Sequence, residues 1–314
     1  MARGQDTHRP LHGVALKIAS VTVFMGMAVC VKLASDEVPP GEIVFFRSFF
    51  AIPVIVFWLW QRHELATGLK TDHPMAHVWR GMIGASAMGL SFTALGLLPL
   101  PEVTAIGYAS PLLVVVFAAM FLGERIRLYR LSAVFLGLIG VMVMLAPRLS
   151  VAGIEAATKD ETLGAMAMLL GAVFMALATC FVRKMVETEE SAAIVFYFSL
   201  TCTVLSLFTL PFGWVLPSLE VLGLLILAGL LGGVAQIFLT ESFRHGDASL
   251  IAPFEYASMV MSLAIGWFVF AEAPRNETLT GAVLVIAAGL VVIWRERQLG
   301  LERKEARRAV SQNG

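Results

Sequence analysis

Long apolar runs follow one another along the 314-residue chain, and they constrain its fold more than any other feature. A helix needs roughly 20 apolar residues to cross the ~30 Å hydrocarbon core of a bilayer, and each run has about that length. The connections between the runs are short and leave no room for a soluble domain. The runs cover residues 13–33, 42–60, 77–97, 102–122, 128–146, 163–183, 192–214, 220–242, 249–270 and 278–295. The sequence therefore predicts an all-α membrane protein with ten transmembrane helices.

The composition supports this prediction and excludes several functions. Charged residues make up 15% of the chain, against about 25% in soluble domains, and the mean hydropathy is +0.81. The formal net charge is zero, so there is no electrostatic case for a nucleic-acid partner. Three cysteines, Cys30, Cys180 and Cys202, lie in apolar runs and are predicted to pack rather than to form disulfides. The six histidines lie in polar connections or at a helix mouth, so we expect neither a metal site nor a cofactor.

Lysine and arginine are distributed unevenly between the two sets of connections. One set, which includes Lys17 and Arg80, carries 18 of the 23 basic residues, the other set carries three, and Lys32 and Arg47 lie inside helices. The positive-inside rule therefore places both termini in the cytoplasm. The first run has no Ala-x-Ala cleavage site, so we expect a retained helix rather than a signal peptide. We predict a multi-pass protein of a bacterial inner membrane.

Short sequences from the first half recur in the second half. Residues 43–48 (IVFFRS) are echoed by residues 194–199 (IVFYFS) at an offset of 151, and residues 108–110 (YAS) recur at 256–258 at an offset of 148. Each copy holds five predicted spans, and an odd number makes the second copy enter the membrane from the opposite side. Such inverted repeats are typical of transporters, with a solute site near the membrane midplane.

The repeat divides the chain into five parts. They are a cytoplasmic N-terminus (1–12), a first five-helix repeat (13–147), a periplasmic connection (148–162), a second five-helix repeat (163–295) and a basic cytoplasmic tail (296–314).

Motifs in the first copy resemble the EamA branch of the drug/metabolite transporter superfamily. They are Val38-Pro-Pro40 before a helix with Arg47, then Pro111, Leu122-Gly-Glu124, Gly137 and Gly140. The second copy departs from this pattern, with Phe198 in place of Arg47 and Met259 in place of Pro111. The resemblance implies ten helices around a central cavity, with alternating access for a small organic metabolite. The candidates are an amino acid, a nucleoside, a flavin or S-adenosylmethionine.

Charged residues within spans are the first candidates for the transport site, because a charge near the membrane centre is costly. Glu255 is interpreted as the best buried acid, either a protonatable carboxylate that couples transport to protons or a structural carboxylate. Arg47 is expected to snorkel or to pair with Glu102, with a direct role toward an anionic group as the alternative. Lys32 is expected to pair with Asp36 at the surface.

Polar and aromatic residues in the repeated segments complete the candidate pathway. Tyr108 and Tyr256 should face a central cavity from opposite sides, where each phenol could stack on a ring and donate a hydrogen bond. The alternative is that both are ordinary core aromatics. Ser110, Ser258 and Gln236 are weaker candidates, because hydrogen bonding between helices explains most such residues. Glu102 begins a predicted helix, where a carboxylate also suits the helix dipole.

Three functional classes compete for this pattern. A secondary transporter is favoured, with a small-molecule solute and the lipid bilayer as partners, a monomer sufficient and a homodimer left open. A passive channel is the alternative, although its selectivity would rest on rings of charges or carbonyls in an oligomer. A lipid-modifying membrane enzyme would need clustered acids, a histidine pair or a nucleophile elbow, and the sequence has none of these.

Overall fold

The computed structural model describes residues 10–65, 67–122, 128–149, 159–245, 254–255 and 257–312. Those residues form helices, turns and short connections without any strand, which confirms the predicted all-α class. The helices are α1 (Pro10–Ala34), α2 (Pro40–Phe49), α3 (Ala51–Gln61), α4 (Pro74–Leu97), α5 (Leu100–Gly107), α6 (Ala109–Leu122), α7 (Leu128–Leu149), α9 (Lys159–Met185), α10 (Ser191–Leu207), the 3₁₀ turn η1 (Leu210–Phe212), α11 (Leu219–His245), α13 (Ala257–Phe270) and α14 (Asn276–Gln312).

Many of these helices are apolar enough to enter a membrane. Five stretches of the described chain are also long enough to cross one, namely Leu11–Ala34, Pro40–Gln61, Leu100–Phe117, Lys159–Met185 and Leu219–His245. Shorter apolar helices cover Ser132–Met144, Ser191–Leu207, Ala257–Phe270 and Asn276–Val291. Large hydrophobic side chains lie exposed on many of these helices, as expected for a surface that faces lipid. The chain is a multi-pass membrane protein, and the number of ten spans stays a prediction.

Two of the predicted spans are broken into pairs of helices by proline. Pro53 has no N–H to donate to the carbonyl of Phe49, four residues earlier, and α2 ends at that residue. In the same way Pro111 leaves the carbonyl of Gly107 without its donor, and α5 ends there. The second break places Tyr108 at the junction between α5 and α6.

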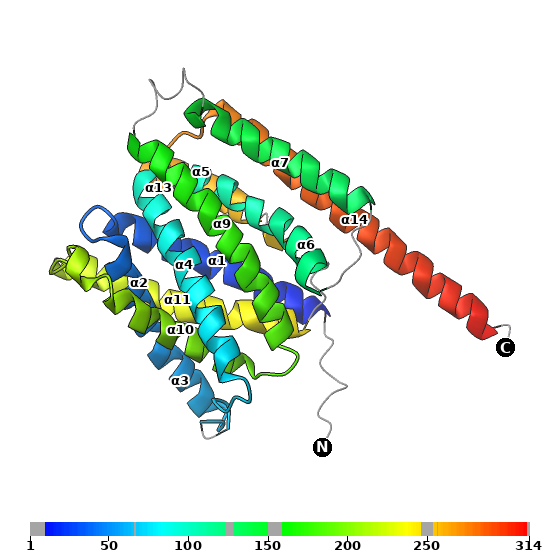
Figure 1. Cartoon of the computed structure of the whole chain (residues 1–314), viewed down its shortest axis with the longest axis horizontal. Coiled ribbons are helices and arrows are strands. Elements are labelled where there is room, and N and C mark those ends of the chain that lie inside the picture. Colours follow the sequence, from blue (N-terminus) through cyan, green and yellow to red (C-terminus); the bar gives the residue numbers. More distant parts are fainter. Residues whose placement is uncertain are drawn as a thin grey trace.

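The helices pack in pairs that join the two halves of the chain. Helix α1 lies along α11, α4 lies along α9, and α7 lies along α14, as Figure 1 shows. Helix α2 also packs against α10, and α5 packs against α13. Glycines allow close approach at two further contacts between the halves, because a Cβ on Gly81 of α4 would lie 2.5 Å from Thr201 of α10, and one on Gly229 of α11 would clash with Phe50 at the end of α2. The core therefore forms between the halves rather than within each half.

Candidate functional site

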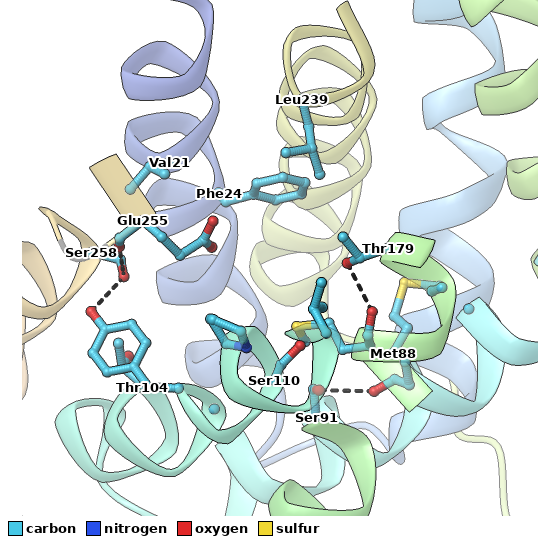
Figure 2. Close-up of a pocket in the computed structure, with 18 of the residues that line it drawn as sticks. Val21, Phe24, Met88, Ser91, Thr104, Ser110, Thr179, Leu239, Glu255 and Ser258 are labelled. Carbon is cyan, nitrogen blue, oxygen red and sulfur yellow. Dashed lines mark hydrogen bonds between the residues drawn. The ribbon is translucent and has the colours of Figure 1, made fainter. Parts of the chain in front are cut away.

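A cavity of about 740 Å³ lies among the helices and is the candidate site. Its wall is mostly apolar, with side chains such as Val21, Phe24 and Met88 that Figure 2 shows around the open space. Cavities of roughly 300–1,000 Å³ commonly hold small organic ligands. The polar and charged residues that line this cavity are Lys17, Arg47, Arg80, Ser91, Thr104, Tyr108, Ser110, Thr179, Arg183, Gln236, Glu255 and Ser258.

The structure brings most of the predicted site residues to this cavity. Of the residues proposed from the sequence, those that line the cavity are Arg47, Tyr108, Ser110, Gln236, Glu255 and Ser258. Tyr256 lies outside the described residues, so its predicted position opposite Tyr108 stays a prediction. Glu102 is buried on α5, and its carboxylate lies 3.8 Å from Nε of Arg275 rather than in the cavity lining.

Tyr108 and Ser258 link the helix break in the first half to the start of α13. The two hydroxyl oxygens are 2.8 Å apart, and the Ser258 hydroxyl donates to the carbonyl oxygen of Glu255 at 2.6 Å (Figure 2). Because that hydroxyl has one proton, Tyr108 donates to Ser258. The Tyr108 side chain is buried and its hydroxyl is held by this bond, so the phenol is oriented by a residue from the other half.

Glu255 forms an ion pair with Lys17 of α1 at the cavity wall. Two expectations from the sequence were wrong here. The Glu255 side chain is 42% exposed rather than deeply buried, and Lys17, assigned by the sequence to the cytoplasmic connections, has only 5% of its side chain exposed. Because Lys17 lies well inside the long helix α1, its stem is covered by the bundle, and its ammonium group meets Glu255 at the cavity wall.

Lys32, near the other end of α1, also pairs with a glutamate from the second half. Its Nζ lies 3.0 Å from Glu272 and donates to the carbonyl of Leu98 at 2.8 Å, so the predicted surface pair with Asp36 is wrong. Glu272 also accepts the N–H of Leu100 at 2.9 Å, at the start of α5. A carboxylate is favourable at that end of a helix. This contact joins α1, α5 and the end of α13.

Arg47 neither snorkels nor pairs with Glu102, contrary to both expectations. It is 2% exposed, and its guanidinium carbon lies 5.5 Å from the ring centre of Phe198 on α10. One nitrogen donates to the carbonyl of Gly232 on α11 at 3.3 Å. Helix α2 turns this side chain inward because its α10 and α11 neighbours occupy that face.

Arg80 is the functional candidate that sequence reasoning missed. The sequence assigns it to the cytoplasmic charges, but it is 5% exposed, lines the cavity and lies 4.2 Å from the same Phe198 ring centre. A signal was present in the sequence, because Arg80 is the fourth residue of the predicted span 77–97 and has Gly84 one turn later. A glycine leaves space beside a long side chain, and a Cβ on Gly84 would clash with the Arg80 guanidinium.

Metal-ligating residues do not gather in the described part of the chain, where no three His, Cys, Asp or Glu side chains could hold an ion together. Cys30, Cys180 and Cys202 are buried, and the structure places none of them in a disulfide bond. His77, at the start of α4, is also buried, with Nε2 3.3 Å from Glu189. It lies outside the cavity lining.

A helical bundle with apolar outer faces and a large, partly charged internal cavity is the architecture of a membrane transporter. The sequence profile of the EamA-like transporter family matches residues 11–146 and 162–294. A profile of Solute carrier family 35 matches residues 103–212. The chain therefore belongs to the EamA-like transporter family, as the motifs of its first copy indicated, and it is a transporter rather than an enzyme.

Named relatives cover nearly the whole chain. The Pseudopaline exporter CntI of Pseudomonas aeruginosa is 31% identical over 277 residues, which are 88% of this chain and 94% of the relative. The S-adenosylmethionine uptake transporter of Rickettsia prowazekii is 29% identical over 92% of this chain and 94% of its own length. The Riboflavin transporter of Rhizobium johnstonii is 27% identical over 94% of this chain and 92% of its own length. A solved crystal structure with 21% identity shares the fold, with a TM-score of 0.68 over 92% of this chain and 99% of that chain.

Proposed function

We propose that this protein is a secondary transporter that carries a small organic metabolite across the bacterial inner membrane by alternating access. One observation supports the proposal above all others. A cavity of about 740 Å³ is lined by helices of both halves of the chain, and both halves contribute charged or polar groups to its wall. A solute bound there would be reached from either side by a movement of one half against the other.

Reciprocal contacts support the inverted repeat on which alternating access depends. Helix α1 packs on α11 and α4 packs on α9, so the first and third helices of each half exchange partners. The glycine contacts are reciprocal in the same way, because Gly81 of α4 meets Thr201 of α10, and Gly229 of α11 meets Phe50 at the end of α2. Gly229 is the equivalent of Gly81 at the offset of 148, and Thr201 is the equivalent of Phe50 at the offset of 151. These are the offsets of the sequence repeat, and a pseudo-twofold axis between the halves would produce both contacts.

The glycines beside the cavity also make reciprocal contacts between equivalent positions of the two halves. Gly84 lies against Phe198, and Gly232, at the offset of 148, lies against Arg47. Arg47 and Phe198 are themselves equivalent positions at the offset of 151, and they contact each other. Equivalent residues can meet in this way only close to a twofold axis. The axis would therefore pass near the cavity, between α2 and α10.

The solute that we propose is a small polar or heteroaromatic metabolite. The relatives are named for pseudopaline, S-adenosylmethionine and riboflavin, and amino acids and nucleosides are further candidates. Glu255 would couple transport to protons or contact a cationic group of the solute. Both termini would lie in the cytoplasm, and tags at the two ends should be accessible from that one side. A monomer would suffice, and a homodimer is compatible with this mechanism.

Counterflow in proteoliposomes tests the proposal. A thermal-shift screen of the purified protein against amino acids, nucleosides, flavins and S-adenosylmethionine first selects a solute, because a ligand of the folded state raises the melting temperature. Vesicles loaded with an excess of that unlabelled solute should then accumulate the labelled solute transiently above equilibrium. A passive channel would only equilibrate the label, so the absence of an overshoot would refute a carrier.

A further inference from the structure

Two buried arginines lie near one phenylalanine ring at the cavity wall and form what we name the arginine site: Arg47, Arg80 and Phe198. The guanidinium carbons of Arg47 and Arg80 lie 5.5 Å and 4.2 Å from the ring centre, so one aromatic ring holds both cations close together. All three residues line the cavity. They come from α2, α4 and α10, so the fold rather than local sequence brings them together.

The arginine site has no counter-ion within the chain that the structure describes. Neither guanidinium forms an ion pair there, and four nitrogens, Nε and Nη1 of each arginine, have no hydrogen-bond partner. The contact of Arg47 with the Gly232 carbonyl satisfies one nitrogen with a neutral acceptor. Buried charges normally have a partner of opposite sign, because removal of an ion from water is costly. Two cations side by side increase that cost.

Other charges at the cavity do not balance this site. Among the described lining residues the cations are Lys17, Arg47, Arg80 and Arg183, and the one carboxylate, Glu255, is paired with Lys17. The cavity is therefore positively charged beside Phe198. Guanidinium groups bind planar or tetrahedral oxyanions through two parallel hydrogen bonds, and they also stack on aromatic rings.

We propose that the arginine site binds an anionic oxygen group of the transported solute, a carboxylate or a phosphate. The apolar remainder of the cavity then holds the body of the solute. This inference rests on the proposed transport function and adds the charge of its substrate. The solute supplies the counter-ion that the protein lacks, and its negative group is held where α2, α4 and α10 meet.

Thermal unfolding of the full-length protein in detergent, with matched probes, tests the inference. Indole-3-acetate and phenyl phosphate supply the two oxyanions, and indole-3-acetamide is the neutral match of the first. We expect a saturable rise in melting temperature with at least one oxyanion and none with the amide. A rise with indole-3-acetate alone would identify a carboxylate site, and a rise with phenyl phosphate alone a phosphate site. Equal effects of acid and amide, or no effect of either oxyanion, would overturn the proposal.

Variants locate the effect on the arginines. Arg80→Gln and Arg47→Gln should each weaken the apparent affinity for the stabilising probe roughly tenfold or more, since hydrogen bonds to charged groups are strong. Arg80→Lys keeps the positive charge and should retain part of the affinity for the probe. Arg62→Gln is the control, because Arg62 is exposed and pairs with Glu64 at 3.4 Å. Full retention of affinity in both glutamine variants would contradict the proposal.

The two proposals can fail separately. Oxyanion binding at the arginine site without counterflow would remove the carrier function and leave the anion site. Counterflow of a solute that has no anionic group, with no loss in Arg80→Gln, would leave the carrier and remove the anion site.

Discussion

Two groups of buried cations in the helix bundle differ in whether they have a carboxylate partner. Along α1, Lys17 and Lys32 each pair with a glutamate of the second half, Glu255 and Glu272. The arginine site, where α2, α4 and α10 meet, has no carboxylate partner in the described chain. The paired cations hold the halves together, whereas the unpaired cations are free to bind a ligand. Both groups are largely buried, so burial does not distinguish structural charges from charges available to a solute. The presence or absence of a carboxylate partner does.

The strongest test of this contrast compares the stability of two matched variants. Lys32→Met leaves Glu272 with 20% of its side chain exposed and no cationic partner. We expect a loss of roughly 2 kcal/mol in the free energy of unfolding, less than the ~3–5 kcal/mol of a fully buried pair. Arg80→Met leaves no carboxylate without its partner and puts an apolar side chain beside Phe198, so it should cause no loss. Melting temperatures in detergent compare the stability of the two variants. Equal losses would contradict the distinction between paired and unpaired cations.

Glu255→Gln tests whether the pair with Lys17 serves transport. The variant should insert and fold normally but reduce counterflow roughly tenfold or shift its pH dependence, because an interaction between charged groups contributes about 1.5 kcal/mol. Glu277→Gln, in the first turn of α14, is the matched control. If uptake is unchanged across the pH range, Glu255 has no part in the mechanism.

A smaller effect is expected from the glycine that accommodates Arg80. A methyl group at Gly84 would clash with the guanidinium and lie 2.5 Å from Phe198, so Gly84→Ala should displace the arginine. Crowding of about 1 kcal/mol would weaken oxyanion binding roughly fivefold, as the probe titrations measure. Gly89→Ala, on the same helix with no atom within 4 Å, should leave the affinity unchanged. Identical titrations for the two variants would show that packing at Gly84 does not position Arg80.

The smallest effect should come from a neutral hydrogen bond at the cavity. Tyr108→Phe removes the donor to Ser258 and should lower the free energy of unfolding by about 1 kcal/mol. A double-mutant cycle with Ser258→Ala isolates the contact. A coupling energy near zero would mean that this bond does not help to join the halves.

Part of the site was within reach of sequence reasoning. Arg47, Tyr108 and Ser258 belong to the repeated segments, and all three line the cavity. The partners of Lys32 and Arg47 were predicted wrongly, because the predicted pairs relied on closeness in sequence or at a membrane face. Lys32 pairs with Glu272 of the second half, and Arg47 lies against Phe198, also of the second half. No local pattern encodes such distant contacts.

The sequence alone determined the all-helical class, the membrane environment and the family, because apolar length and family motifs are local properties of a chain. Only the tertiary structure decided that Lys17 and Arg80 line the cavity rather than lie in the connections between helices. Their depth depends on which neighbouring helix covers them, as α10 covers Arg80. Whether a charge is paired depends on contacts between helices far apart in sequence, and packing alone fixes those contacts.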